Sequence, residues 1–167
     1  MSEPAIRPAR REDAEAMARI FREGVEDRIA TFGTTPASAA EMAALAESDA
    51  PVLVVERGGE VLGWAKVGPY DDAHHYYASV GEATLYIARE ARGGGLGAPL
   101  LLALDEAAER AGFHKLIGKI FTTNAASVAL VRRCGWSEVG VHRRHGRLDD
   151  EWRDVLVVEK LLGDAAR

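Results

Sequence analysis

A strand, a glycine-rich turn and the start of a helix follow one another in the segment Tyr86–Pro99, and this order constrains the fold more than any other feature. The first residues of a helix present unpaired backbone N–H groups and a partial positive charge. Four glycines within Gly93–Gly97 let that backbone approach an anion with no Cβ atom in the way. The segment therefore predicts a strand–loop–helix unit that holds a phosphate-bearing small molecule.

Two common phosphate-binding motifs do not fit this loop. A P-loop has Lys and Ser or Thr after its last glycine, whereas Ala98 and Pro99 follow Gly97 here. A dinucleotide fingerprint fits the glycine spacing but needs an acidic residue about 20 residues further on. The segment Phe113–Phe121 contains no Asp or Glu. An ordinary tight connection between strand and helix stays as the plain alternative, although four glycines exceed what a turn needs.

A third pattern fits throughout, because Arg-x-x-Gly-x-Gly at Arg92, Gly95 and Gly97 opens a helix directly after a strand. In this the chain resembles the GNAT superfamily of N-acetyltransferases, which bind the pyrophosphate of acyl-CoA with such a loop. The resemblance implies an α/β (α+β) fold, with a mixed, mostly antiparallel central sheet flanked by helices in the order βααβββαβαββ. It also implies acetyl-CoA as the cofactor and acetyl transfer to an amine as the reaction.

The hydrophobic spacing along the chain predicts the same order of elements. Helices are predicted over Glu12–Glu26, from the N-cap Ser38 to about Glu47, over Gly97–Ala111 and from the N-cap Asn124 to Arg133. Strands are predicted over Ala5–Pro8, Val52–Glu56, Val61–Val67, Ala83–Ala88, Leu116–Phe121, Trp136–His142 and Trp152–Leu161. The basic cluster Arg143–Arg147 is expected in the turn of the closing hairpin. Residues 1–167 are expected to form a single domain, with Gly163–Arg167 as a short flexible tail.

Within the superfamily the chain is similar to the branch that acetylates phosphinothricin, methionine sulfoximine and arsinothricin. The likeness is carried by the segments Arg28–Pro36, Val80–Ile87, Phe121–Ser127, Gly140–Asp149 and Trp152–Val155. It implies a small amino-acid-like amine as the substrate and a homodimer as the assembly.

The resemblance also implies cofactor-binding roles at matching positions. Leu85, Tyr86 and Ile87 would offer strand backbone groups to the pantetheine arm. Asn124 and Ser127 would contact the far end of the cofactor, although Asn124 can equally be a plain helix N-cap. The pyrophosphate would be bound by the loop residues Arg92, Gly93, Gly94, Gly95, Leu96, Gly97 and Ala98.

Glu82 is the candidate general base. An amine arrives protonated at neutral pH and must lose a proton before it attacks a thioester, and a carboxylate at the cleft can accept that proton. Glu82 precedes the predicted cofactor-binding strand, matches the acid used by this branch, and has no cation among Val80, Gly81 and Ala83. The plain alternative is a surface charge at the end of a strand.

One position departs from the superfamily pattern. Many members carry a Tyr seven residues after the motif Asn, where it protonates the leaving thiolate, and here that position is Val131. Cys134 lies one helical turn further on, but a thiol is a weak donor and is expected to pack in the core. Water is therefore expected to protonate the thiolate. The departure keeps open a cofactor-binding sensor module without turnover.

The substrate pocket is expected under Phe32 and an aromatic segment that contains Tyr70, Tyr76 and Tyr77. This segment would narrow the cleft and so disfavour a protein amine, which is a third possible substrate class.

Relatives tend to place Arg in that segment, because its planar fork pairs with anionic head groups. This chain has Asp71 and Asp72 instead, followed by His74 and His75. Arg28 and Arg144 are candidates for the missing cation. The pattern predicts weaker activity on phosphinothricin-type anions than on methionine sulfoximine or another less anionic amine. The plain alternative is that both Asp side chains point to water and do not affect the choice of substrate.

Composition and charge disfavour several other function classes. A formal net charge of −5 argues against nucleic acid as a partner. No apolar run approaches the roughly 20 residues of a membrane span, and the first residues lack the features of a signal peptide. The single cysteine, Cys134, cannot form an internal disulfide, which favours the cytoplasm. No metal is predicted.

Overall fold

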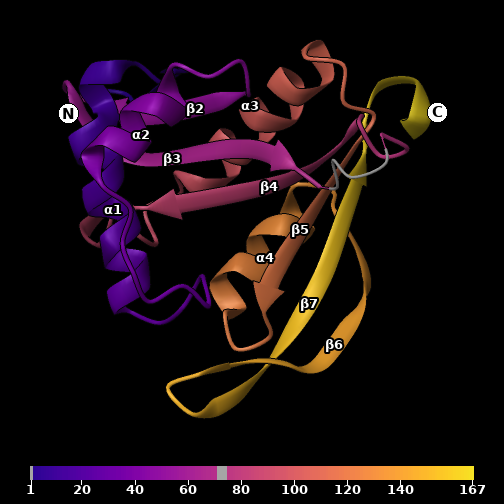
Figure 1. The fold of residues 1–167 in the computed structure, drawn as a ribbon. Helices are drawn as coiled ribbons and strands as arrows, with labels where there is room; N and C mark the ends of the chain where they lie inside the picture. Colours follow the sequence, from indigo (N-terminus) through magenta and orange to yellow (C-terminus); the bar gives the residue numbers. More distant parts are fainter. Residues whose placement is uncertain (1, 71–74) are drawn as a thin grey trace.

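The computed structural model describes residues 2–70 and 75–167, which form a seven-stranded sheet in the order β1-β2-β3-β4-β5-β7-β6 (Figure 1). Neighbouring strands are antiparallel except for the parallel pair β4–β5. The strands are β1 Ala5–Pro8, β2 Val52–Arg57, β3 Glu60–Pro69, β4 Val80–Ile87, β5 Lys115–Phe121, β6 Ser137–Leu148 and β7 Glu151–Leu161. The helices are α1 Ala14–Glu26, α2 Ala39–Ala46, α3 Gly97–Arg110 and α4 Ala125–Arg133. The predicted fold class and element order are confirmed.

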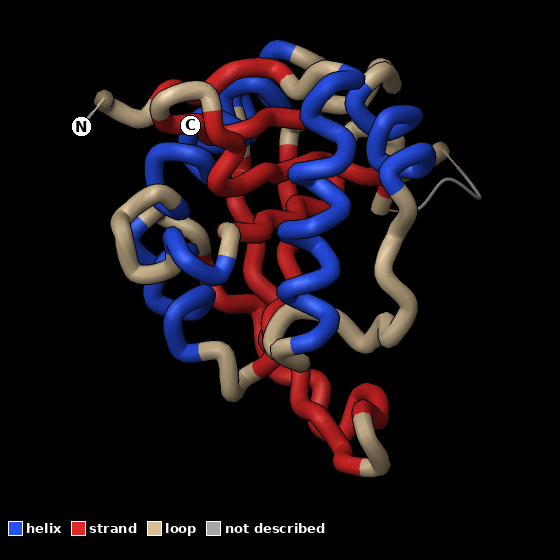
Figure 2. The backbone as a smooth tube through the Cα atoms, turned by 90° about the vertical axis from the view of Figure 1, so that its left-hand side faces the viewer, coloured by secondary structure: helices blue, strands red, loops and turns tan. Residues whose placement is uncertain are grey.

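Helices cover both faces of the sheet, as the view along its edge shows (Figure 2). Along β2, Val52 and Val54 pack in the core under α1 and α2, whereas Leu53 and Val55 pack in the core under α3. Successive side chains of a strand point to opposite faces, so a strand covered on both sides needs a continuous apolar run. This explains why the sequence of β2 does not alternate between apolar and polar residues.

The ends of the helices follow the local signals in the sequence. The Ser38 hydroxyl accepts a hydrogen bond from the Glu41 N–H at 3.1 Å, and the Glu41 carboxylate accepts one from the Ser38 N–H at 2.6 Å. These two bonds form a capping box at the start of α2 and confirm the predicted N-cap Ser38. Gly112 and Gly135 follow α3 and α4 at φ values of +94° and +80°, which glycine adopts without a Cβ clash.

The strands β4 and β5 pair over three residues and then separate. Val80–Glu82 lie opposite Lys115–Ile117, and no pairing joins the following residues of the two strands. The divergence is visible in Figure 1, where β4 and β5 leave a common point in different directions. The edge of β4 beyond Glu82 is therefore left without a neighbouring strand in the middle of the sheet.

Two sequence predictions need correction. The closing hairpin turns at Asp149 and Asp150, with φ values of 49° and 64°, while the basic cluster 143–147 lies within β6. Short Asp side chains tolerate the left-handed conformation that a tight hairpin turn requires. β4 begins at Val80, before the predicted Ala83, because its first residues pair with β5. The C-terminal residues Gly163–Ala166 form a 3-10 helix.

Across the described ranges, no helix combines the length and apolar character that a membrane crossing requires.

Candidate active site

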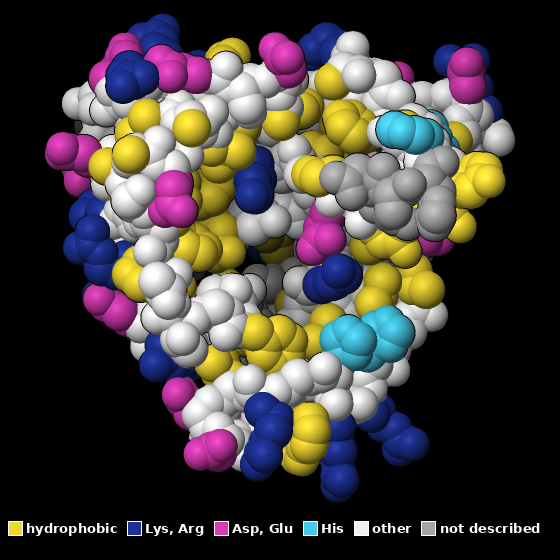
Figure 3. Space-filling view, viewed as in Figure 1, with side chains coloured by type: hydrophobic (Ala, Val, Ile, Leu, Met, Phe, Trp, Pro, Cys, Tyr) yellow, Lys and Arg dark blue, Asp and Glu magenta, His cyan; other side chains and the backbone are white. Residues whose placement is uncertain are grey.

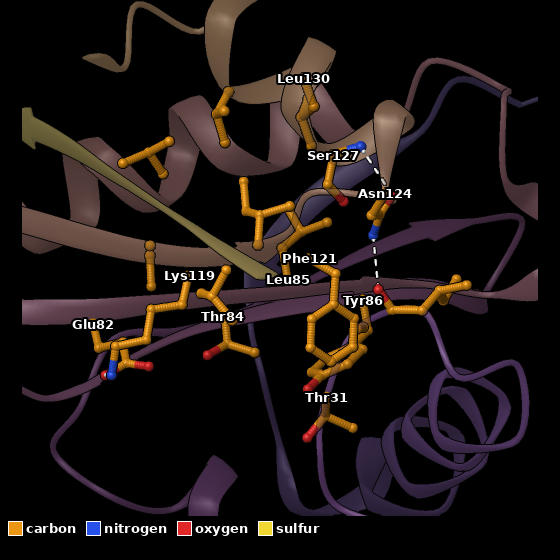
Figure 4. Close-up of a pocket in the computed structure, with 18 of the residues that line it drawn as sticks. Thr31, Glu82, Thr84, Leu85, Tyr86, Lys119, Phe121, Asn124, Ser127 and Leu130 are labelled. Carbon is orange, nitrogen blue, oxygen red and sulfur yellow. Dashed lines mark hydrogen bonds and ion pairs between the residues drawn. The ribbon is translucent and has the colours of Figure 1, made fainter. Parts of the chain in front are cut away.

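A cavity of about 400 Å³ fills the space where β4 and β5 separate. Figure 3 shows this face of the molecule hollowed, with apolar side chains in the hollow and acidic and basic side chains at its rim. Its walls come from β4 and β5, from the start of α4 and from the loop that follows α1 (Figure 4). The lining residues on these elements include Ile29–Phe32, Glu82–Tyr86, Gly118–Phe121, Asn124, Ser127, Leu130 and Val131.

The open edge of β4 presents backbone hydrogen-bonding groups to this cavity. The Ala88 N–H donates to the Leu62 carbonyl at 2.8 Å, so Ala88 points its backbone groups toward β3. Backbone groups alternate in direction along a strand, so those of Tyr86 also face β3. Those of Leu85 and Ile87 face the opposite edge, which has no neighbouring strand there, although the Ile87 carbonyl accepts a hydrogen bond from Arg92. The geometry thus favours Leu85 and Ile87 over Tyr86 as backbone contacts for a bound molecule.

The side chain of Tyr86 forms part of the wall. Its ring lies 5.1 Å from that of Trp64 and 5.2 Å from that of Phe21, between centroids. Burial among these rings raises the pKa of the Tyr86 phenol to about 12. Tyr86 is therefore neutral at physiological pH and serves as an apolar wall.

The glycine-rich loop has the geometry of an anion site. Gly93 and Gly95 have φ values of +75° and +80°, and no atom lies within 4 Å of an ideal Cβ at either position. Within the described residues, no acceptor is bonded to the backbone N–H groups of Gly95, Leu96, Gly97 or Ala98. These groups open the 14-residue helix α3, whose dipole favours a negative charge at this end. The loop fits the pyrophosphate of an acyl-CoA.

Arg92 holds this loop against α1. Its Nη1 lies 2.6 Å from the Asp27 carboxylate, and its Nε donates to the Ile87 carbonyl at 3.2 Å. Asp27 also accepts hydrogen bonds from Arg89, and the two arginines lower the pKa of the Asp27 carboxyl to about 2. The ion pairs fix the entry to the loop.

Asn124 joins two walls of the cavity. Its carbonyl oxygen accepts from the Ser127 N–H at 3.2 Å, which confirms the predicted N-cap of α4. Its amide donates to the Ile29 carbonyl at 3.1 Å. Asn124 and Ser127 lie at one end of the cavity, and Glu82 lies at the other (Figure 4).

Glu82 lies at the point where the two strands part. It is the third residue of β4, within the strand, where the sequence had placed it before the strand. Its Oε2 atom lies 3.3 Å from the Lys119 Nζ atom on β5. The sequence neighbours offered no cation, but the parallel pairing of β4 with β5 brings one 37 positions away to the carboxylate.

Of the predicted substrate-binding residues, one lines the cavity and the three tyrosines do not. Phe32 lines the cavity and packs edge-on against Phe121, with the ring centroids 4.8 Å apart. Tyr70 and Tyr77 are exposed and contact each other, and these two and Tyr76 are not among the described lining residues. Their position does not support the expected narrowing of the cleft.

The charged residues that the sequence analysis expected near the substrate are not found among the described lining residues. Asp71, Asp72 and His74 lie outside the described residues. The Arg28 Nε atom is 2.8 Å from Asp149, and neither Arg28 nor Arg144 lines the cavity.

No described side chain at or near the position of the missing Tyr is suited to protonate the leaving thiolate. Val131 lines the cavity with an apolar side chain. Cys134 is buried in the core, and its S–H points to the Ala98 carbonyl at 3.9 Å. Burial raises the pKa of the Cys134 thiol. The predicted packing role of Cys134 is confirmed.

Several cavity residues were not among the candidates of the sequence analysis. Lys119, Thr84 and His145 all line the cavity. Lys119 carried a signal, because it is a lone charge inside the apolar run Leu116–Phe121. His145 was assigned to an exposed turn, and its ring stacks on that of His142 with the centroids 4.4 Å apart.

Comparison with known proteins identifies the family to which this fold and cavity belong. Residues 15–136 match the model of the acetyltransferase (GNAT) family. The chain belongs to this family. It is an N-acyltransferase whose cosubstrate is acetyl-CoA.

Two characterised relatives align over most of this GNAT chain. It is 32% identical over 160 residues to the L-methionine sulfoximine/L-methionine sulfone acetyltransferase of Pseudomonas aeruginosa, covering 93% of this chain and 92% of that protein. It is 31% identical over 162 residues to the phosphinothricin N-acetyltransferase of Alcaligenes faecalis, covering 94% and 82%.

Two solved structures share the whole fold. The Salmonella typhimurium protein yncA, solved with its cofactor acetyl-CoA, superposes with a TM-score of 0.92 at 27% identity, over 98% of this chain and 96% of that one. A ribosomal-protein-alanine N-acetyltransferase from Brucella melitensis gives a TM-score of 0.89 at 35% identity, over 95% and 99%.

Proposed function

We propose that this GNAT enzyme acetylates the α-amine of a small amino-acid-like substrate, of the methionine sulfoximine, phosphinothricin or arsinothricin type, with Glu82 as the general base. One observation carries the proposal. The Glu82 carboxylate lies where β4 and β5 part, so it shares one cavity with any group bound on the open edge of β4. The names of the two characterised relatives support the substrate class.

We assign acetyl-CoA to the glycine loop and the open edge of β4. The backbone groups of Leu85 and Ile87 would pair with the amide-like pantetheine arm as a neighbouring strand does. The four N–H groups of residues 95–98 would bind the pyrophosphate. Arg92 would hold the loop in place through Asp27.

In the proposed reaction, Glu82 accepts a proton from the substrate ammonium, directly or through one water molecule. The free amine nitrogen then forms a bond to the thioester carbonyl carbon and releases its second proton to water as the carbon–sulfur bond breaks. Water protonates the departing thiolate, since Val131 and Cys134 offer no suitable donor. Backbone N–H groups on the β4 edge are available to polarise the carbonyl, and proximity supplies much of the remaining acceleration.

Within this class we propose methionine sulfoximine as a better substrate than phosphinothricin. Phosphinothricin carries a second anionic head group, and Arg is the residue best suited to such groups. No Arg is among the described residues that line the cavity. Comparing kcat/KM across methionine sulfoximine, methionine sulfone, phosphinothricin and arsinothricin tests the ranking. A clear preference for phosphinothricin or arsinothricin would reject it.

A protein N-terminus is the second candidate acceptor. The name of the Brucella melitensis structure favours it, and the tyrosines expected to narrow the cleft do not line the cavity. A peptide that begins with alanine therefore belongs in the same assay. Faster acetylation of that peptide than of every amino acid would replace the first proposal with this one.

We further propose that residues 1–167 act as one N-acetyltransferase domain, in a cytoplasmic homodimer. The resemblance to the phosphinothricin branch supports the dimer. Exposed apolar side chains on β6 and β7 also support it, namely Val139, Val141, Trp152 and Leu161. The mass of the particle in solution tests the dimer.

A further inference from the structure

Lys119 has an unusual place for a lysine. It lies in the middle of β5, between the apolar neighbours Gly118 and Ile120, and its side chain borders the cavity. Its partner Glu82 lies on β4 at the last position that pairs with β5. No other Lys or Arg is among the described residues that line the cavity.

The Glu82–Lys119 pair contributes little to holding the strands together. Its atoms are 3.3 Å apart, and the Lys119 and Glu82 side chains are 48% and 32% exposed. Ion pairs that are this accessible to water add little stability. Lys115, on the same strand, instead pairs with Glu159 of β7 outside the cavity. The placement of Lys119 therefore calls for a role toward a bound molecule.

We propose that Lys119 binds the carboxylate of the substrate, so that Glu82 and Lys119 together recognise a zwitterionic α-amino acid. This inference rests on the proposed function and specifies its substrate class. An α-amino acid carries its ammonium and its carboxylate on one carbon, and the pair presents the two opposite charges at a similar separation. Glu82 then faces the amine that it must deprotonate, and Lys119 fixes the orientation of that amine.

The ionisable groups around Lys119 are compatible with this role. The described cavity wall contributes Glu82, Tyr86 and His145 besides Lys119 itself. Tyr86 stays neutral because burial raises its pKa. Lys66 lies opposite Thr84 on β3, on the same face of the sheet, but it does not line the cavity. Lys66 is therefore the alternative candidate for binding the substrate carboxylate, and it is tested alongside Lys119.

The test compares L-methionine sulfoximine with its carboxamide, which keeps the amine and the side chain but lacks the negative charge. The measured quantity is kcat/KM for L-methionine sulfoximine divided by kcat/KM for its carboxamide, determined for the wild type and for each variant. Any intrinsic difference between the two amines cancels when variants are compared with the wild type.

In Lys119→Met this ratio should fall by on the order of 10- to 100-fold, the effect of one lost charge-assisted hydrogen bond. Lys119→Arg should keep most of the ratio, because the charge remains. Lys66→Met and Lys115→Met should leave it unchanged.

Three results would overturn the inference. The ratio could stay constant in Lys119→Met, or it could fall equally in Lys66→Met. Both substrates could also lose activity equally with a shifted pH profile, which would mean that Lys119 acts only through Glu82. If the wild type acetylates no member of the proposed class, with methionine sulfoximine, methionine sulfone, phosphinothricin and arsinothricin all assayed, the proposed function fails and takes this inference with it. If it acetylates methionine sulfoximine and the ratio does not respond, the inference about Lys119 alone fails.

Discussion

Replacement of Glu82 by glutamine tests the chemistry most directly. Glu82→Gln keeps the size of the side chain and an oxygen toward Lys119, but it cannot accept a proton. Removing a general base typically costs 10²- to 10⁴-fold in rate. We expect a loss of at least about 10²-fold in kcat, which corresponds to ~2.7 kcal/mol of transition-state stabilisation. Affinity for acetyl-CoA, measured by calorimetry, should stay close to that of the wild type.

The structure indicates how little of this loss of activity can result from a less stable fold of the variant. The Glu82–Lys119 ion pair is partly exposed on both sides, and such pairs contribute about 0–1 kcal/mol. The free energy of unfolding in denaturant should therefore change by less than about 1 kcal/mol. Glu159→Gln is the matched control, because Glu159 pairs with Lys115 on the same sheet but outside the cavity. It should retain full turnover.

The pH dependence separates a base from a charge that only positions the substrate. Without Glu82, the amine must arrive already deprotonated. The rate of Glu82→Gln should then climb by roughly tenfold per pH unit until the amine itself has titrated, and exceed the pH response of the wild type. Turnover equal to that of the wild type at neutral pH, or an identical pH profile at reduced rate, would refute the assignment of Glu82 as the base.

Two further predictions concern the cofactor loop and its support. Gly95→Val should weaken acetyl-CoA binding by about 10²-fold or more in calorimetry, because its Cβ would block the approach of the pyrophosphate. Gly59→Val has a similar positive φ with open space around it, so it imposes the same strain away from the site and should bind normally. The pKa of Asp27 is about 2 when folded, against 3.8 without its arginines. The unfolded state therefore binds more protons in this range, and the unfolding free energy should fall as the pH drops from about 4 to about 2. Asp27→Asn should lack this part of the fall in denaturation at each pH, and an identical pH dependence would contradict the assignment.

The sequence predicted the elements and the loop because their signals are local. The capping box of Ser38 and Glu41 lies within four residues, and the apolar stripe of α3 recurs with the period of its own helix. The glycine-rich loop is likewise a local signal, and Gly93 and Gly95 adopt positive φ angles that glycine allows. Such signals depend on contacts between residues close in the chain, so they can be read without knowing the fold. The turn at Asp149 and Asp150 was missed because the adjacent basic cluster gave a competing signal.

Only the tertiary structure decided what surrounds Glu82. The separation of β4 from β5 has no local signature, because it depends on how far two strands pair across a parallel crossover. That pairing brings Lys119 to the Glu82 carboxylate. A separate long-range contact joins Arg28 to Asp149 in the turn between β6 and β7, and Arg28 is not among the described residues that line the cavity. The local pattern of the chain thus determined the secondary structure and the phosphate loop. The charges that face the substrate depend on long-range strand pairing, which places side chains far apart in sequence within one cavity.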